Sequence, residues 1–227
     1  MKKQLRILFL GKANDEHCDK ALNLLRRNVG GVTAGLSEWG DPFPQAFCDW
    51  EGDYIVSYLS RWIVPADLLR RAGVAAINFH PAPPSFPGVG CNNFALYEGV
   101  DEFGVTCHYM NPKVDTGEVV AVKRFPVYPE DDVASLLSRT YDYQLILFYE
   151  MFHLMCSGER LPKSSETWAR KPYTRTEFNS LFTIDPSMNQ EEIGRRVRAT
   201  SFRGYNPEVL LGKYRFVYQG NENEASP

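Results

Sequence analysis

The first eighty residues alternate between short β-rich apolar runs and segments whose apolar positions recur at helical spacing. A loop rich in proline and glycine, over 37–51, separates the two halves of this pattern. The order strand, helix, loop, strand, helix, strand predicts a mostly parallel sheet with crossover helices. The expected elements are strands over 6–10, 53–59 and 74–79 and helices over 15–27 and 65–73, with Gly30-Gly31 ending the first helix.

The pattern changes after His80, where six prolines and glycines fall within residues 81–90 and predict a rigid loop. Asp131 or Asp132 is placed to cap a long amphipathic helix that runs to about Cys156. Between the loop and this helix we expect a short helix over 92–97 and strands over 104–110 and 117–125. Beyond the long helix we expect a helix over 188–199, a strand over 214–218 and a frayed polar end over 221–227.

These elements predict an α/β fold in which a mostly parallel, twisted sheet carries helices on both faces. The composition shifts near Leu161, where basic and aromatic residues begin to alternate. We therefore expect two parts, a main domain over 1–160 and a small C-terminal appendage over 161–227.

The composition and charge of the chain argue against several classes of function. The formal net charge is -3, which argues against a nucleic-acid binder, because such a protein needs a basic field to neutralise phosphates. Five cysteines, an odd number without C-x-x-C spacing, are typical of reduced thiols in the cytoplasm. The four histidines are scattered, so we expect no metal site. The apolar core of MKKQLRILFLGK is too short for a signal peptide, and no apolar run approaches the roughly 20 residues of a membrane span.

Candidate chemistry begins at Asn78-Phe-His80-Pro81, at the carboxyl end of an expected parallel strand, where ligands bind in open α/β sheets. Taken alone, such a pair is more often a cap or a core-edge feature. Two further motifs favour function: a Gly104-Val-Thr-Cys-His108 strand and, seven residues after His108, an Asp115-Thr-Gly117 turn.

Together, the Asn-x-His-Pro motif, the Pro-Gly loop, the Gly-x-Thr-x-His strand and the Asp-x-Gly turn resemble the 10-formyltetrahydrofolate-dependent formyltransferase family over roughly 53–125. The resemblance implies a Rossmann-like fold and makes Asn78, His80 and Asp115 the expected catalytic residues. An attacking amine generates an oxyanion on the formyl group, and amide and imidazole N–H groups can stabilise it. A nearby carboxylate can relay the proton that the amine loses. For His108 we expect a structural, hydrogen-bonded role.

The resemblance also places the folate co-substrate, whose pteridine is held in this family largely by backbone groups. The stretches that correspond here are the segment after the second apolar strand and the loop that runs into Asp115. The expected folate-binding residues are Ser60, Arg61, Ile63, Lys113 and Val114.

The resemblance says less about which molecule accepts the formyl group. A tRNA formyltransferase should carry a further nucleic-acid-binding domain, and only about 70 residues follow the long helix. The loop His80-Pro-Ala-Pro-Pro-Ser-Phe-Pro-Gly88 and the segment 92–97 resemble enzymes that formylate a dTDP-linked 4-amino- or 3-amino-dideoxyhexose for bacterial surface polysaccharides such as O-antigen. Cations for the pyrophosphate and aromatic rings for the base are then required. The candidates, of which we expect two or three to touch ligand, are Lys12, Trp168, Lys171, Tyr173, Arg198 and Tyr205.

Two alternatives stay open, a phosphoribosylglycinamide formyltransferase of purine synthesis and a non-catalytic folate- or nucleotide-binding module. A dinucleotide oxidoreductase is disfavoured, because the first strand leads into Gly11-Lys-Ala-Asn-Asp and lacks a G-x-G-x-x-G cradle. The long apolar helix and the aromatic-rich C-terminal part favour a homodimer.

Overall fold

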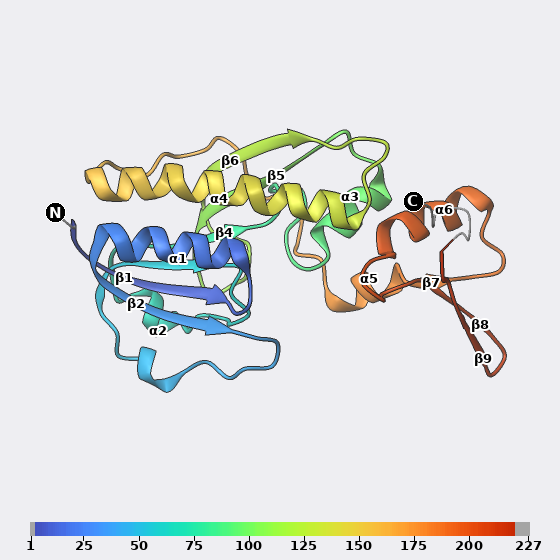
Figure 1. Ribbon diagram of the computed structural model, residues 1–227, viewed down its shortest axis with the longest axis horizontal. Helices are drawn as coiled ribbons and strands as arrows, with labels where there is room; N and C mark the ends of the chain where they lie inside the picture. Colours follow the sequence, from blue (N-terminus) through green and yellow to red (C-terminus); the bar gives the residue numbers. More distant parts are fainter. Residues whose placement is uncertain (1–2, 221–227) are drawn as a thin grey trace.

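A six-stranded sheet forms the centre of the chain, for which a computed structural model describes residues 3–220 (Figure 1). The expected end segment 221–227 lies outside these residues. The strand order is β2-β1-β3-β4-β5-β6. The first four strands run parallel, and β5 runs antiparallel to both of its neighbours. This confirms the mostly parallel sheet. The strands are β1 (Lys3–Lys12), β2 (Val29–Ser37), β3 (Gly52–Tyr58), β4 (Ala72–His80), β5 (Glu102–Tyr109) and β6 (Val119–Pro126).

Strand β2 is missing from the sequence prediction, which treated Gly30-Gly31 only as a helix terminator. Helix α1 (Glu16–Asn28) does end there, but β2 begins at once and pairs with β1 from Gly31 to Ser37. A Cβ on Gly31 would lie 2.8 Å from the Leu5 carbonyl oxygen. The glycine therefore permits a close approach of two strands, a use of glycine that a single sequence does not distinguish from a turn.

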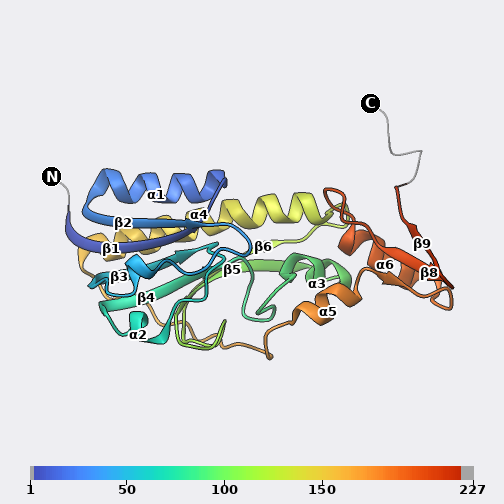
Figure 2. The same cartoon turned by 90° about the horizontal axis from the view of Figure 1, so that it is seen from below.

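Helices cover both faces of the sheet, as expected. Figure 2 shows α1 and α4 (Val133–Ser157) on one side and the short α2 (Ala66–Leu69) on the other. On the first side, Phe9 of the sheet packs edge-to-face against Phe148 of α4. On the second side, Leu68 of α2 joins a smaller apolar cluster with Leu8 and Ile55. Helix α2 is shorter than the predicted 65–73, because the chain enters β4 at Ala72.

Helix α4 fixes the position of β4. Asp132 caps it in a reciprocal capping box with Ser135, and Gly158 follows its last turn. Near its middle, the buried Gln144 donates a hydrogen bond of 2.6 Å from Nε2 to the Phe79 carbonyl oxygen. Phe79 stands between Asn78 and His80, so this bond ties the helix to the backbone that carries both side chains.

The C-terminal part lies at one end of the molecule, beside α3 (Cys91–Glu98) (Figure 1). Its backbone is joined to the proline-rich loop, since Tyr173 N donates to Pro87 O at 2.8 Å and Val89 N donates to Tyr173 O at 3.2 Å. The elements of the C-terminal part are α5 (Arg175–Ser180), β7 (Thr183–Ile184), α6 (Gln190–Thr200), β8 (Glu208–Leu211) and β9 (Tyr214–Val217), with the strands in the order β7-β8-β9. Of these, α6 and β9 were predicted and α5, β7 and β8 were missed, as was η1 (Gln45–Phe47) in the earlier loop. Within residues 3–220, no helix combines the length and apolar character needed to cross a membrane.

Candidate active site

Asn78, His80 and Asp115 lie together at the carboxyl edge of the sheet. Asn78 and His80 lie at the end of β4, two positions apart and therefore on one face of the strand. The antiparallel register of β5 places His108 directly opposite Asn78. Asp115 comes from the loop between β5 and β6 and adopts a left-handed backbone conformation, with φ of 48°. Its carboxylate reaches both rings, with Oδ2 3.4 Å from His80 Nδ1 and Oδ1 3.4 Å from His108 Nε2. The three residues proposed from the sequence are therefore brought into one cluster.

Asp115 is only 5% exposed, yet it is held as a carboxylate. Burial alone would raise its pKa, but the charge of His80, the hydrogen bond and charge of His108 and the Gly88 N–H lower the pKa to about 2. The Gly88 amide donates to Oδ2 at 2.8 Å. At neutral pH the group is a fixed negative charge beside two imidazole rings, an arrangement that suits a proton relay.

The two histidines are oriented by backbone carbonyls, which can only accept. His80 Nε2 donates to Phe86 O at 2.9 Å, so Nδ1 is the atom that faces Asp115. His108 Nδ1 donates to Tyr109 O at 2.9 Å, so Nε2 faces the site and lies 3.0 Å from Asn78 Nδ2. His108 thus connects Asn78 to Asp115, in agreement with the hydrogen-bonded role expected from the sequence.

Trp168 and Cys91 complete the walls around these rings. The Trp168 ring packs edge-on against the rings of His80 and His108, with centroids 5.7 and 5.0 Å away. Its Nε1 donates to Gly117 O at 2.7 Å, which locks the indole in place. The Cys91 thiol is 3.7 Å from His80 Nε2, and burial raises its pKa far above the ordinary value. Cys91 is therefore a packing residue and not a nucleophile.

A cavity of about 510 Å³ opens from the catalytic residues and runs between the two loops that the sequence assigned to folate. All five candidates from these loops line it together with Asn78, His80 and Asp115: Ser60, Arg61, Ile63, Lys113 and Val114. Ile63 and Val114 are exposed apolar side chains, 66% and 48% accessible. An apolar rim around a few polar groups is typical of a site for a flat organic ligand.

Several cavity-lining residues were missed from the sequence. Trp39 and Trp62 come from loops, Tyr141 from α4, and Arg175 from the C-terminal part. Tyr141 and the tryptophans had no periodic pattern that separated them from packing aromatics. Arg175 belongs to a basic and aromatic run whose other members had been preferred.

The six candidates for nucleotide-sugar contacts divide into three groups. Tyr173 and Arg198 are used inside the protein. Tyr173 is 6% exposed, its ring is stacked on Phe94 at 3.7 Å and covered by the Arg170 guanidinium at 3.3 Å, and its hydroxyl donates to Glu98. Arg198 donates to the carbonyls of Asp131 and Tyr128. Base stacking on Tyr173 is therefore wrong for this conformation, because neither ring face is open.

The other four candidates lie at different distances from the cavity. Trp168 contacts the catalytic rings, as described above. Lys12 forms an ion pair of 2.7 Å with Asp15 and lies 5.3 Å from the ring centroid of the cavity-lining Tyr141. Lys171 and Tyr205 are exposed and are not among the lining residues.

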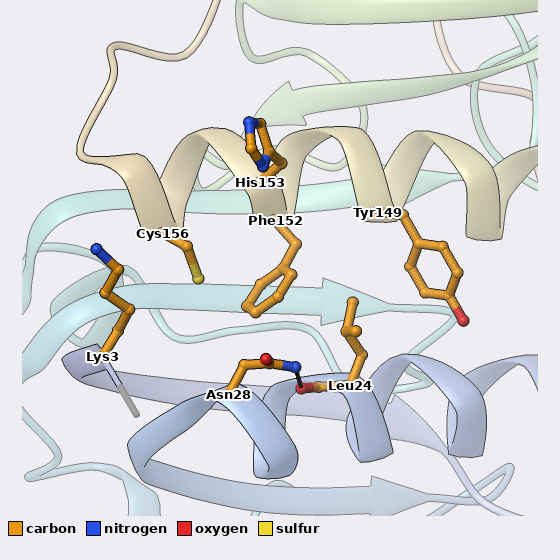
Figure 3. A pocket seen from close by; sticks show the side chains of 7 residues that line it. All are labelled: Lys3, Leu24, Asn28, Tyr149, Phe152, His153 and Cys156. Atoms are coloured by element: carbon orange, nitrogen blue, oxygen red, sulfur yellow. Dashed lines mark hydrogen bonds between the residues drawn. The ribbon is translucent and has the colours of Figure 1, made fainter. Parts of the chain in front are cut away.

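A second cavity, of about 440 Å³, opens between α1 and α4 (Figure 3). Lys3, at the start of β1, is one of its lining residues, so it lies at the amino edge of the parallel strands, away from the catalytic cluster. Phe152 and Leu24 point toward each other across it in Figure 3. Within residues 3–220, no group of three His, Cys, Asp or Glu side chains is arranged to hold a metal ion.

Comparison with known proteins identifies a family domain within the chain. Residues 45–151 match the family described as formyl transferase, and this stretch contains Asn78, His80 and Asp115. The chain therefore contains a formyl transferase domain over these residues. The protein is an enzyme that transfers a formyl group.

The curated relatives of this formyltransferase include a sugar N-formyltransferase, methionyl-tRNA formyltransferases and a trifunctional purine biosynthetic protein. The chain is 25% identical over 209 residues to GDP-perosamine N-formyltransferase of Brucella melitensis, covering 91% of this chain and 79% of the relative. It is 32% identical over 147 residues to methionyl-tRNA formyltransferase of Levilactobacillus brevis, covering 64% of this chain but 44% of the relative. The first alignment reaches through the C-terminal part and the second leaves more than half of the relative unmatched.

Solved structures show the same fold along nearly the whole chain. A sugar N-formyltransferase from Shewanella sp. superposes with a TM-score of 0.76 at 17% identity, covering 95% of this chain and 96% of the other. The N-formyltransferase of Helicobacter canadensis, solved with folinic acid and dTDP-3-aminofucose, gives 0.67 at 16% identity and covers 94% and 95%. At these identities the similarity shows the fold alone. It extends over the C-terminal part as well as the main domain.

Proposed function

We propose that the enzyme transfers the formyl group of 10-formyltetrahydrofolate to the amine of a nucleotide-linked amino-deoxysugar. The observation that carries the proposal is the single cavity in which Asn78, His80 and Asp115 meet both loops expected to hold folate. A donor lying between these loops would present its formyl group to the catalytic cluster. The relative solved with folinic acid and dTDP-3-aminofucose supports both reactants.

The geometry suits a direct attack by the amine. A bond forms between the sugar nitrogen and the formyl carbon, the bond from that carbon to N10 of the folate breaks, and one proton passes from the amine to the folate nitrogen. The Asn78 amide can donate to the formyl oxygen as it gains negative charge, and so can His80 when Nδ1 carries a proton, since Nε2 is held by the Phe86 carbonyl oxygen. The Asp115 carboxylate stabilises the protonated His80 and can carry the proton that the amine releases.

For the acceptor we favour a dTDP-linked 4-amino- or 3-amino-dideoxyhexose that serves bacterial surface polysaccharide synthesis, in the cytoplasm. The match to GDP-perosamine N-formyltransferase supports a sugar amine, and the relative solved with dTDP-3-aminofucose supports the dTDP carrier. We assign the C-terminal part over 161–227 to completing the nucleotide-sugar site. Backbone hydrogen bonds of Tyr173 join this part to the proline-rich loop. Among the candidate contacts we retain Lys12 and Trp168 as the residues nearest to the cavity.

We further propose a homodimer that forms through the β8–β9 hairpin. Leu211, Tyr214 and Phe216 are between 48% and 61% exposed. They lie on one face of the hairpin, since Leu211 pairs with Tyr214 and Phe216 is two positions further along β9. An exposed apolar face of this kind marks interaction sites. Sedimentation at micromolar concentration tests it: a dimer that Phe216→Glu converts to a monomer supports the hairpin interface, and a monomeric wild type contradicts it.

A panel of acceptors tests the reaction. The purified enzyme is mixed with 10-formyltetrahydrofolate and, separately, dTDP-linked 4-amino and 3-amino sugars, GDP-perosamine and glycinamide ribonucleotide. Mass spectrometry then detects exchange of one amine hydrogen for a formyl group. We expect formylation of an amino sugar. Formylation of glycinamide ribonucleotide alone would move the enzyme to purine synthesis, and binding without any product would indicate a non-catalytic module.

A further inference from the structure

Arg61, one of the expected folate-binding residues, meets Trp39 and Arg175, which were not predicted, at the edge of the cavity. The Arg61 guanidinium lies 4.5 Å from the ring centroid of Trp39, and the Arg175 guanidinium lies 5.1 Å from the same ring. All three residues line the cavity of about 510 Å³. Trp39 is 65% exposed, so most of this indole stands free beside the two cations.

The three residues come from distant segments that the fold holds in place. Arg61 follows β3, and its backbone N–H donates to Ser37 Oγ at 2.9 Å. Ser37, the last residue of β2, is fully buried and donates in turn to Gly11 O at 3.0 Å. Trp39 stands two residues beyond this anchor. The loops after β2 and β3 are thus fixed to each other at the point where Arg61 and Trp39 meet.

Arg175 brings the C-terminal part into the same site. It is the first residue of α5, directly after Thr174, whose hydroxyl accepts from Glu177 N at 3.2 Å while the Glu177 carboxylate bonds back to Thr174 N. The reciprocal capping box fixes the backbone from which Arg175 extends. The cavity is therefore closed by residues from both 1–160 and 161–227.

The two guanidinium groups have no anionic partner in the described part of the chain. The side chains of Arg61 and Arg175 make cation–π contacts. Neither side chain forms a hydrogen bond or an ion pair within residues 3–220. The nearest acids in sequence to Trp39 are engaged elsewhere: Glu38 accepts from Asn14 Nδ2 at 2.7 Å, and Asp41 accepts from the Glu38 backbone N–H at 2.7 Å. In a protein of net charge -3, two such cations at a ligand cavity need an explanation.

We propose that Trp39, Arg61 and Arg175 form a subsite for the oxyanion group of one reactant, which holds that reactant across the junction of the two parts of the chain. The guanidinium groups bind the anion through charge-assisted hydrogen bonds, and the indole packs against the planar or apolar segment next to it. The inference rests on the proposed function for the identity of the reactants. Both are anionic, through the diphosphate of the acceptor or the glutamyl carboxylates of the folate.

Equilibrium binding without turnover tests the subsite. Isothermal titration is carried out with thymidine diphosphate, guanosine diphosphate and folinic acid on the wild type, Arg61→Gln, Arg175→Gln and Trp39→Leu. The matched control is Arg27→Gln, which removes the same charge from an exposed position in the last turn of α1. Circular dichroism and thermal unfolding establish that each variant is folded.

The loss of each charge-assisted contact should weaken the Kd of the affected probe roughly ten- to hundredfold, and Arg27→Gln should bind as the wild type does. Weakening for the diphosphates identifies the acceptor as the source of the anion, and weakening for folinic acid identifies the donor. Wild-type affinity for every probe in both arginine variants overturns the subsite, as does a wild type that binds none of them. A wild type that binds these probes but formylates no amino sugar refutes the proposed function and leaves the subsite standing.

Discussion

Gly88 joins the catalytic carboxylate to the C-terminal part, and its replacement by alanine gives a worked prediction. The residue has φ of +93°, and an added Cβ would meet Tyr173 O at 2.4 Å, Tyr173 N at 2.6 Å and Pro172 C at 3.0 Å. These are backbone atoms, which cannot rotate away. The left-handed conformation costs an alanine about 1–2 kcal/mol, and forced overpacking costs about 1–3 kcal/mol more. Gly88→Ala should therefore lower the free energy of unfolding by about 2–5 kcal/mol.

Activity should fall as well, because the displaced Gly88 N–H holds Asp115 Oδ2 at 2.8 Å. A misplacement of about 1 Å in a catalytic group can cost roughly a hundredfold in rate, so we expect kcat to fall tenfold or more. Urea denaturation and a formyl-transfer assay measure the two effects. The control is Gly99→Ala, which has φ of +67° and no atom within 4 Å of the new Cβ. It should lose only the conformational cost of about 1–2 kcal/mol and keep its kcat. Equal losses in the two variants would refute the close approach to Tyr173.

Three further predictions concern the same region. The pKa of Asp115 is lowered to about 2 from an ordinary 3.8, so its ionisation stabilises the fold by about 2 kcal/mol above pH 3.8. This contribution is lost as the pH falls through 2. In urea denaturation at a series of pH values, Asp115→Asn should show a smaller loss of stability between pH 4 and pH 2 than the wild type, and an equal loss would contradict the prediction. Tyr173→Phe removes the hydroxyl bond to Glu98 and should cost about 1 kcal/mol of stability without weakening nucleotide binding in titration calorimetry, whereas weaker binding would restore Tyr173 as a ligand contact. The buried Cys91 should resist iodoacetamide in the native protein while the partly exposed Cys48 reacts, as peptide mass spectrometry can show, and equal labelling would mean that the loop over Cys91 opens.

The cluster of Asn78, His80 and Asp115 could be predicted because the pattern of strands indicates the edge of the sheet and the resemblance to the formyltransferase family names the three residues. Asn78 and His80 follow a clear apolar run, and the carboxyl edge of a parallel sheet collects such side chains. Asp115 was found through its spacing from His108, and the register of β5 against β4 explains why that spacing works. The start of α4 was predicted to within one residue, since Asp131 and Asp132 were both left open as the cap and Asp132 is the cap.

The missed features depend on contacts between distant segments. Gly31 allows β2 to lie against β1, which no local pattern reveals. Tyr173 was expected to stack on a base, but Phe94 and Arg170 cover its two faces, and these contacts arise only after the appendage folds back on the proline-rich loop. Arg175 and Trp39 are 136 positions apart in the printed sequence and meet at the cavity for the same reason.

The central claim is that Asn78, His80 and Asp115 transfer a formyl group to a sugar amine. Its most direct test compares the wild type with Asp115→Asn in reactions containing 10-formyltetrahydrofolate and the dTDP-linked amino sugar that the acceptor panel identifies, with both the tetrahydrofolate and the formyl-sugar quantified. We predict one-to-one formation of the two products by the wild type, and a kcat lower by roughly two to four powers of ten in a folded Asp115→Asn. Wild-type turnover by that variant, or no formyl-sugar from any amino sugar, would contradict the claim.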